Sequence, residues 1–171
     1  MKKGLKIVIG IVIGIYLVLV VFTTAFLLNK NDYGVSKFFG RYLVINEEKT
    51  LEDYEQGSLL IIKPVEPEDV AVGDKAFFYD TYSVNKKIKY AEVIRKEKIN
   101  ENETTFTMKD NSPVSGQYVL GTKKSTIETN FFGKILNVVQ SRWGFLFIVV
   151  FPLFLALIYE VYAIYKEFKK K

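Results

Sequence analysis

The sequence predicts a mainly β fold: a coiled antiparallel β-sheet domain, extracytoplasmic, flanked by two transmembrane helices. Three observations predict it. A long apolar run lies near each end of the 171-residue chain, short β-rich runs separated by turn residues lie between them, and lysines flank the outer end of each apolar run. The length allows one domain and its membrane anchors.

The charge distribution separates the chain ends from the middle. Residues 29–142 hold 17 basic and 17 acidic side chains, so the formal net charge of +5 comes from the lysines near the two ends. This pattern is typical of membrane flanks and argues against nucleic acid as a partner. The chain has no histidine and no cysteine. That excludes a Ser-His-Asp triad, a Cys nucleophile and the usual zinc ligands, and the sequence predicts neither a metal nor a cofactor.

The first apolar run, residues 7–28, predicts a transmembrane helix preceded by a short cytoplasmic N-terminus, residues 1–6. It has 22 residues without a charge, which reach about 33 Å as a helix against a hydrocarbon core of about 30 Å. A cleaved signal peptide is the alternative. An uncleaved anchor is favoured because the run is long for a signal peptide and no good cleavage motif follows it.

The second apolar run, residues 143–164, predicts a second transmembrane helix followed by a basic tail, residues 165–171. Pro152 is expected to kink it, and Glu160 either reaches the membrane surface or serves as a functional carboxylate. Lysines before the first run and after the second place both termini in the cytoplasm by the positive-inside rule. We therefore expect a two-pass protein of the plasma membrane, with residues 29–142 outside.

The middle region reads as short strands joined by turns. β-branched and aromatic residues predict strands at 58–62, 76–79, 89–95, 104–108 and 117–120. Residues 131–139 fit either a strand or a helix. Gly57, Gly73 and Asp74 are typical of turns. Short strands at this spacing, without long helices between them, favour an antiparallel sheet.

Four blocks in this region together resemble a known family. They are residues 54–63, residues 70–79, residues 106–112 and residues 131–136. In order and spacing they are similar to the type I signal peptidases of the archaeal and endoplasmic-reticulum-like branch. The resemblance runs from about Tyr42 to the second apolar run. It implies a membrane-anchored serine-type endopeptidase fold that processes signal peptides during protein secretion.

The residues that carry the chemistry in that family are not retained. By the resemblance, the nucleophilic serine falls on Lys49, the catalytic base falls on Ala91, and only the acidic position is kept, as Asp110. Peptide hydrolysis by this route needs an activated hydroxyl and a base within hydrogen-bond reach. The sequence thus predicts a pseudoenzyme with no intact catalytic set, in which Gly57, Gly73 and Asp74 are structural turns.

Three functions remain open at this stage. In the first, an inactive member of the family binds an extended peptide as an added strand. Its partners would be the membrane and either peptides of secretory precursors or surface proteins, or an active peptidase. In the second, Thr50 and Lys89 serve as non-standard catalytic residues of an active peptidase. In the third, the chain is purely structural, and no cleft lies beside Lys49, Ala91 and Asp110.

Overall fold

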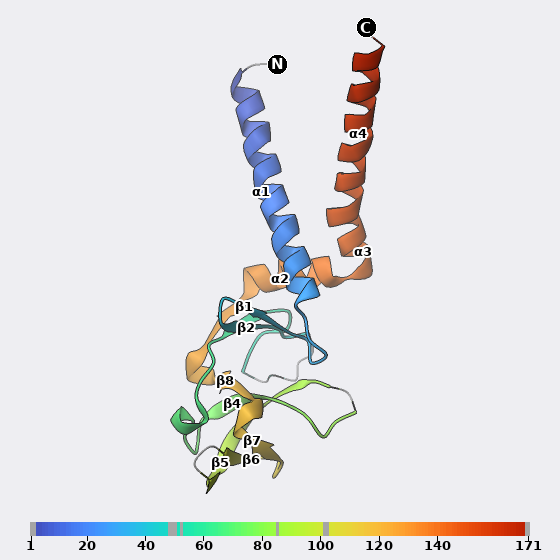
Figure 1. Cartoon of the computed structure of the whole chain (residues 1–171). Coiled ribbons are helices and arrows are strands. Elements are labelled where there is room, and N and C mark those ends of the chain that lie inside the picture. The colour runs from blue at the N-terminus through green and yellow to red at the C-terminus, as the bar shows by residue number, and fades with distance from the viewer. Residues whose placement is uncertain (1–2, 48–50, 52, 85, 101–102, 170–171) are drawn as a thin grey trace. The chain divides into compact units, whose positions relative to one another are not determined.

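The chain divides into two compact units. A computed structural model describes residues 3–47, 51, 53–84, 86–100 and 103–169 (Figure 1). The helical unit comprises Met1–Ala25 and Ile135–Lys171, and the β unit comprises Phe26–Lys134.

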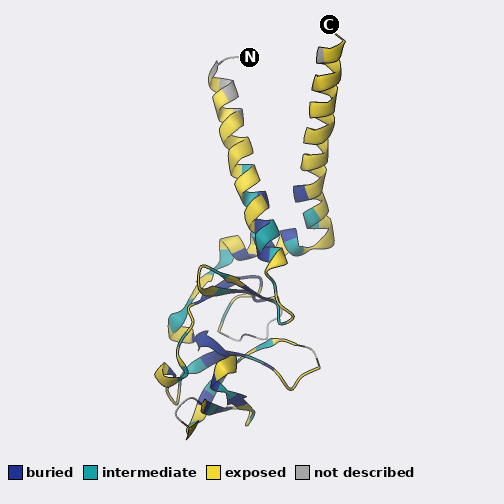
Figure 2. Cartoon of the chain, in the orientation of Figure 1, coloured by how far each residue is buried: buried dark blue, intermediate teal, exposed yellow. Residues whose placement is uncertain are grey.

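The helical unit contains two helices that are long and apolar enough to span a membrane. Its elements are α1 (Lys3–Leu28), α2 (Asn130–Gln140), α3 (Arg142–Phe145), the π-helix η4 (Leu146–Val150) and α4 (Phe151–Phe168). The last residues of α1 and the first residues of α2 belong to the β unit. The apolar stretches are Gly10–Leu28 and Arg142–Lys166. Figure 2 shows most of their surface as exposed, and an exposed apolar helix surface needs an apolar surrounding.

A tyrosine of α1 bonds to the helix backbone near Pro152. Proline has no N–H, so the carbonyl of Ile148, four residues earlier, receives no helix hydrogen bond from it. The Tyr16 hydroxyl donates to the carbonyl oxygens of Ile148, at 2.9 Å, and Val149, at 3.2 Å. The π-helix η4 lies directly before α4 and ends two residues before Pro152, where a kink was expected. Tyr16 thereby adds a side-chain hydrogen bond to the backbone of the second apolar helix, where Pro152 cannot donate one.

The β unit contains two antiparallel sheets. The first has the order β1 (Val35–Phe38), β2 (Arg41–Ile45), β3 (Leu59–Ile62) and β9 (Thr126–Thr129). The second has the order β7 (Pro113–Ser115), β6 (Glu103–Met108), β5 (Ile88–Asn100), β4 (Lys75–Tyr79) and β8 (Val119–Thr122). Three short 3₁₀ turns connect strands, at Pro67–Asp69, Gly116–Tyr118 and Lys123–Ser125. All pairings between these strands are antiparallel.

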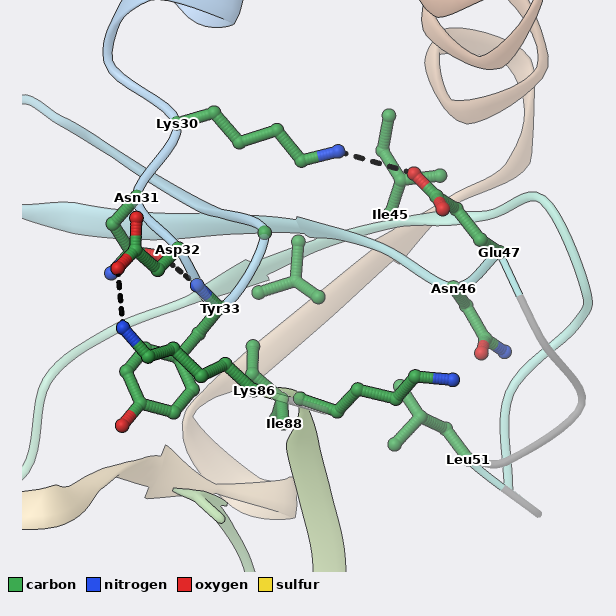
Figure 3. A pocket seen from close by; sticks show the side chains of 13 residues that line it. Lys30, Asn31, Asp32, Tyr33, Ile45, Asn46, Glu47, Leu51, Lys86 and Ile88 are labelled. Atoms are coloured by element: carbon green, nitrogen blue, oxygen red, sulfur yellow. Dashed lines mark hydrogen bonds and ion pairs between the residues drawn. The ribbon is translucent and has the colours of Figure 1, made fainter. Parts of the chain in front are cut away.

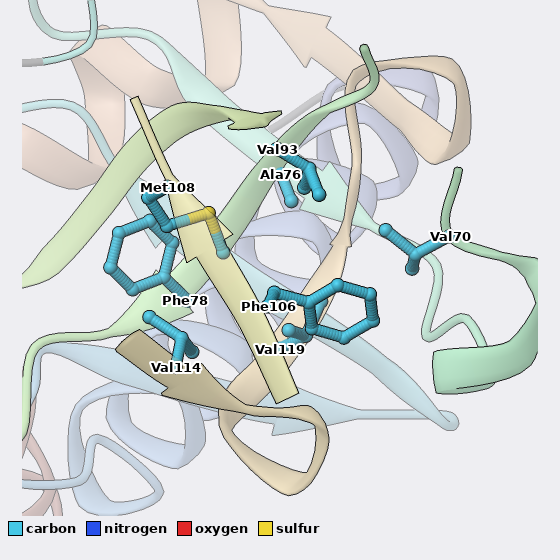
Figure 4. Packing of buried hydrophobic residues seen from close by; sticks show 8 residues of the cluster. All are labelled: Val70, Ala76, Phe78, Val93, Phe106, Met108, Val114 and Val119. Atoms are coloured by element: carbon cyan, nitrogen blue, oxygen red, sulfur yellow. The ribbon is translucent and has the colours of Figure 1, made fainter. Parts of the chain in front are cut away.

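Strand β4 contributes to both apolar cores of the β unit. Ala76 and Phe78 join the core drawn in Figure 4, whose other members are Val70, Val93, Phe106, Met108, Val114 and Val119. Phe77 points to the opposite face and joins the second core, with Val35, Val44, Leu51, Leu60, Ile62 and Leu120. Successive side chains of a strand point to opposite faces. The run 76–78 is apolar throughout because both of its faces are buried.

The predicted β architecture is correct for the β unit but not for the whole chain. Helices account for 44% of residues and strands for 32%, so "mainly β" describes the region between the apolar helices. The runs predicted at 58–62, 76–79, 89–95 and 104–108 fall on β3, β4, β5 and β6. The run at 117–120 begins in a 3₁₀ turn and enters β8 at Val119.

The ambiguous run at 131–139 is helical, and strands β1 and β2 were not predicted. Gly133, Leu136 and Val139 are buried at three-residue spacing on α2, which is the pattern of a helix with one packed face. A Cβ at Gly133 would collide with the carbonyl oxygen of Gly57. The first turn of α2 therefore lies directly against the backbone of the β unit.

Candidate functional site

The first half of strand β5 has one open edge. Residues Ile88–Glu92 pair with β4, and β6 covers the opposite edge only from Val93 onward. The Lys87 carbonyl accepts a hydrogen bond from the Asp80 N–H, which places the backbone groups of Lys87 on the β4 side. The Glu92 carbonyl faces the other way and accepts from the Lys109 N–H at 2.9 Å.

The alternation of the strand identifies the groups on that edge. Because backbone groups of neighbouring residues point to opposite sides of a strand, the N–H and C=O groups of Ile88 and Tyr90 face outward. Among the described residues, no strand pairs with them. We call the outward backbone groups of Ile88 and Tyr90 the β5 edge. Such an edge is a template for an added strand.

A hollow of about 660 Å³ lies beside the β5 edge. Its lining includes Asp80, Ser83, Lys89, Ala91, Lys109 and Asp110. We call it the β5 hollow. It brings together three residues singled out in the sequence: Ala91, Asp110 and Lys89. A purely structural protein was expected to have no cleft at these positions. The β5 hollow contradicts that expectation for Ala91 and Asp110, whereas Lys49 lies outside the described residues.

An ion pair holds the Lys89 ammonium in the β5 hollow. Its Nζ lies 3.0 Å from an Asp80 carboxylate oxygen and 3.9 Å from an Asp110 carboxylate oxygen. The Asp80 side chain is only 7% exposed, and it also accepts from the N–H groups of Tyr82 and Ser83. The Asp80 carboxylate is thus held by the backbone of its own turn, and the half-exposed Lys89 ammonium lies beside it.

Asp110 is fixed by its own turn. Its Oδ1 accepts from the Ser112 hydroxyl at 2.5 Å and from the Ser112 N–H at 3.0 Å. The Ser112 hydroxyl is the main reason that the pKa of Asp110 lies below its usual value, and Lys89 contributes less. Asn111, with φ of 62°, completes the turn in the left-handed region. Asp110 is thus an ionised acceptor whose orientation is set by the backbone.

A second hollow adjoins the first. It has a volume of about 340 Å³, and it shares Lys87 and Ile88 with the β5 hollow. Figure 3 shows its two ion pairs: Lys30 with Glu47, at 3.2 Å, and Lys86 with Asp32, at 2.5 Å. Leu51 also lines it, whereas Lys49 and Thr50 were singled out in the sequence. Those two residues lie outside the described part of the chain.

The remaining residues singled out in the sequence lie in turns. Gly57 and Gly73 have φ of 82° and 91°, in the left-handed region that favours glycine. Asp74 accepts from the Ala71 N–H, at 3.1 Å, and pairs with Lys124, at 2.7 Å. These hydrogen bonds and the Lys124 ammonium lower the pKa of Asp74, with the Lys124 contact as the largest cause.

Asp53 was not singled out in the sequence, although it accepts more side-chain hydrogen bonds than the other carboxylates among the described residues of the β unit. It accepts from Lys75 at 2.8 Å, from Lys123 at 2.9 Å and from the Tyr90 hydroxyl at 2.8 Å. These donors, Lys75 foremost, hold the pKa of Asp53 far below its usual range. Burial, and then the bond to Asp53, raise the pKa of Tyr90. The partners lie 22, 37 and 70 positions away, so no local motif marks the cluster.

The part of the chain that the structure describes contains no group of three or more His, Cys, Asp or Glu side chains placed to hold a metal ion. No family model matches the chain, and neither a curated protein nor a solved structure matches it. The similarity to signal peptidases therefore stays a prediction from the quoted residues. The site is described by its own geometry: an open strand edge beside two adjoining hollows.

Proposed function

We propose that this chain is a membrane-anchored, signal-peptidase-like protein without peptidase activity that binds an extended peptide. The bound segment lies along the β5 edge as an added strand, and its side chains enter the β5 hollow. The protein then acts as an accessory factor in the processing or assembly of secreted or surface proteins. The observation that carries this proposal is the open edge at Ile88 and Tyr90 beside a hollow lined by Ala91 and Asp110.

The chemistry of the β5 hollow supports binding over hydrolysis. Ala91 has no group that accepts a proton, and Asp110 is exposed and turned toward Ser112. Lys89 would have to give up its charge to act as a general base, which would leave the buried Asp80 carboxylate without its cation. Backbone groups on an unpaired edge, in contrast, bind a peptide without any catalytic residue.

The proposal includes a two-pass placement in the plasma membrane. Both termini lie on the cytoplasmic side and the β unit lies outside the cytoplasm. The support is the two helices of sufficient length and apolarity, together with the lysines beyond their outer ends. This placement exposes the β5 edge to proteins that have just crossed the membrane.

Peptide binding along the β5 edge is tested with backbone-modified peptides. The full chain is reconstituted in nanodiscs, and fluorescence anisotropy follows binding of labelled peptides taken from secretory precursors. N-methylation at alternate positions of a bound peptide removes the N–H groups that face β5, so one methylated series is expected to lose affinity and the other to keep it. Equal affinity of both series, or no binding of any precursor peptide, would contradict the proposal.

A matched pair of variants tests the hollow. Ala91→Leu places a larger side chain on a partly buried residue of the β5 hollow, and we expect it to weaken peptide binding several-fold. Ile99→Leu, at an exposed position near the other end of β5, is the control. Thermal unfolding of both variants, compared with the unmodified chain, separates loss of binding from loss of fold.

The second candidate function is an active peptidase that uses Thr50 and Lys89. Its support is that Lys89 lines the same hollow as Ala91 and Asp110. The test supplies secretory precursors to membranes containing the full chain and follows release of the signal peptide. We expect no cleavage. Cleavage that disappears in both Thr50→Ala and Lys89→Ala variants would replace the binding proposal with this one.

A further inference from the structure

Two segments of the β unit share an unusual composition. Phe38, Phe39, Gly40 and Arg41 form the tip of the β1–β2 hairpin, and Phe131, Phe132, Gly133 and Lys134 form the first turn of α2. In each, two aromatic residues precede a glycine and a cation. We call them the hairpin tip and the α2 turn. Neither segment lines the β5 hollow or the hollow beside it.

The hairpin tip holds an aromatic ring in an unfavourable position. Phe39 has φ of 46°, in the left-handed region that bulky residues avoid, and it is 98% exposed. Gly40, with φ of 71°, completes the turn. Folding therefore gains no burial of the Phe39 ring and incurs backbone strain to keep it at the tip. A binding partner whose surface covers the Phe39 ring would account for its exposed position.

The hairpin lies at the end of the first apolar segment. The Ser36 hydroxyl donates to the carbonyl of Phe26, in the last turns of α1, at 2.8 Å. Side chains two positions apart share a face, so Phe38 lies on the same side of β1 as Ser36. That face continues across the sheet through Leu43, Ile61 and Ile127, which are aligned with Ser36 by the strand register.

The exposed part of the sheet face that contains Ser36 and Leu43 is also apolar. Ile127, on the edge strand β9, is 57% exposed. The α2 turn follows β9 directly, with Phe131 69% and Phe132 57% exposed. The close contact of Gly133 with the Gly57 backbone fixes the start of this turn against the β unit. Exposed aromatic side chains thus lie at two ends of the first sheet: Phe39 follows β1, and Phe131 and Phe132 follow β9.

We propose that the hairpin tip and the α2 turn bind the surface of a lipid bilayer that contains anionic lipids. Aromatic rings favour the headgroup region, and Lys37, Arg41 and Lys134 supply the cations that attract anionic headgroups. The apolar segment ends at Leu28, ten residues before Phe38 along the chain, so on the proposed membrane placement the chain itself keeps the hairpin tip close to the membrane. The inference rests on the proposed membrane placement and is independent of peptide binding.

Lipid contact is measured directly with single cysteines, because the chain contains none. The full chain carrying Phe39→Cys is labelled with an environment-sensitive fluorophore and placed in nanodiscs that contain a headgroup-level quencher lipid. We expect quenching several-fold stronger than in the matched Ile99→Cys variant. Ile99 is also exposed, and it lies on the β5–β6 hairpin, at the other end of the β unit from the β1–β2 hairpin (Figure 1).

Lipid charge and a second substitution complete the test. Replacing phosphatidylglycerol with phosphatidylcholine in the nanodisc, or changing Arg41→Glu, is expected to reduce the quenching at position 39. Quenching at position 39 no stronger than at position 99 would overturn the proposal. A spectral shift at position 39 that appears without quenching, and depends on protein concentration, would assign the tip to a protein contact and would also overturn it.

Discussion

At the scale of residues, Asp53 is the carboxylate through which we expect the stability of the β unit to depend on pH. The Asp53 carboxylate accepts hydrogen bonds from three donors on different strands and turns: Lys75, Lys123 and the Tyr90 hydroxyl. Tyr54, Phe77 and Tyr90 stack around them, with ring centroids 4.6 to 5.6 Å apart. The cluster therefore joins a charged network to the second apolar core, and its loss is expected to affect folding.

We expect the ionised Asp53 to stabilise the β unit at neutral pH. Its folded pKa lies below the unfolded value of about 3.9, so this stabilisation is complete above that value and is lost as the pH falls through the lower folded pKa. Asp53→Asn should lower the free energy of unfolding at pH 7 by about 1–3 kcal/mol. It should also flatten the loss of stability below about pH 4.

The measurement is thermal or denaturant unfolding of the full chain in detergent across this pH range. Asp32→Asn is the control, because Asp32 also pairs with a lysine but on the surface. A decline in acid that is equally steep in Asp53→Asn and in the unmodified chain would show that the Asp53 cluster does not contribute to it.

The structure brings together two residues that the sequence singled out, and it shows two carboxylates that the sequence did not single out. The resemblance aligned Ala91 and Asp110, which the fold places in one hollow. Asp80, the buried partner of Lys89, was not predicted, because its ion pair depends on how β4 and β5 are aligned. Asp53 was missed for the same reason. Carboxylates at turns are common in any sequence, and only the fold shows which of them are surrounded by cations.

At the scale of elements, β3 and β4 were predicted and the first hairpin was not, although Val35 and Val44 of that hairpin are buried. The runs that became β3 and β4 are almost wholly apolar and β-rich. β1 and β2 mix charged, aromatic and aliphatic residues, although Gly40 between them marks a turn. The helix α2 was left ambiguous because its apolar residues fit both periods, and the close approach of Gly133 to the Gly57 backbone could not be read from the sequence.

The contact of Tyr16 with the π-helix is an element-scale device that we expect to hold α1 against the second apolar helix. Tyr16→Phe removes the hydroxyl that satisfies the Ile148 carbonyl, at a cost of about 0.6–1.7 kcal/mol for a hydrogen bond within a membrane. Val20 and Val149 belong to one apolar cluster. In a chain that carries Val20→Cys and Val149→Cys, we expect Tyr16→Phe to lower the rate at which the two cysteines form a disulfide.

Pro152 provides the internal control for this contact. Pro152→Ala restores an N–H that can bond to the Ile148 carbonyl, so Tyr16→Phe should then have a much smaller effect. Tyr162→Phe, at an exposed tyrosine of α4, should change nothing. An equal effect of Tyr16→Phe with and without Pro152 would show that the hydroxyl acts in some other way.

At the scale of the whole molecule, the proposed topology predicts which sites an impermeant reagent reaches. In intact cells that express single-cysteine variants, we expect a membrane-impermeant maleimide to label Ile99→Cys and to leave Lys166→Cys unlabelled until the membrane is opened. The reason is the concentration of lysines at both chain ends. Labelling of Lys166→Cys in intact cells would place the C-terminus outside and contradict the two-pass arrangement.

The pairing of β6 with β5 sets a limit on what the open edge can hold. Because the Lys109 N–H already occupies the Glu92 carbonyl, an incoming chain can pair only along Ile88 and Tyr90 before it meets the turn at Asp110. Two residues offer four backbone groups, and at about 1 kcal/mol each they give about 4 kcal/mol, which is close to a millimolar dissociation constant. A lower dissociation constant would require side chains of the bound peptide to contact the two hollows. The edge on its own is suited to brief, repeated encounters with many passing chains rather than to lasting capture of one.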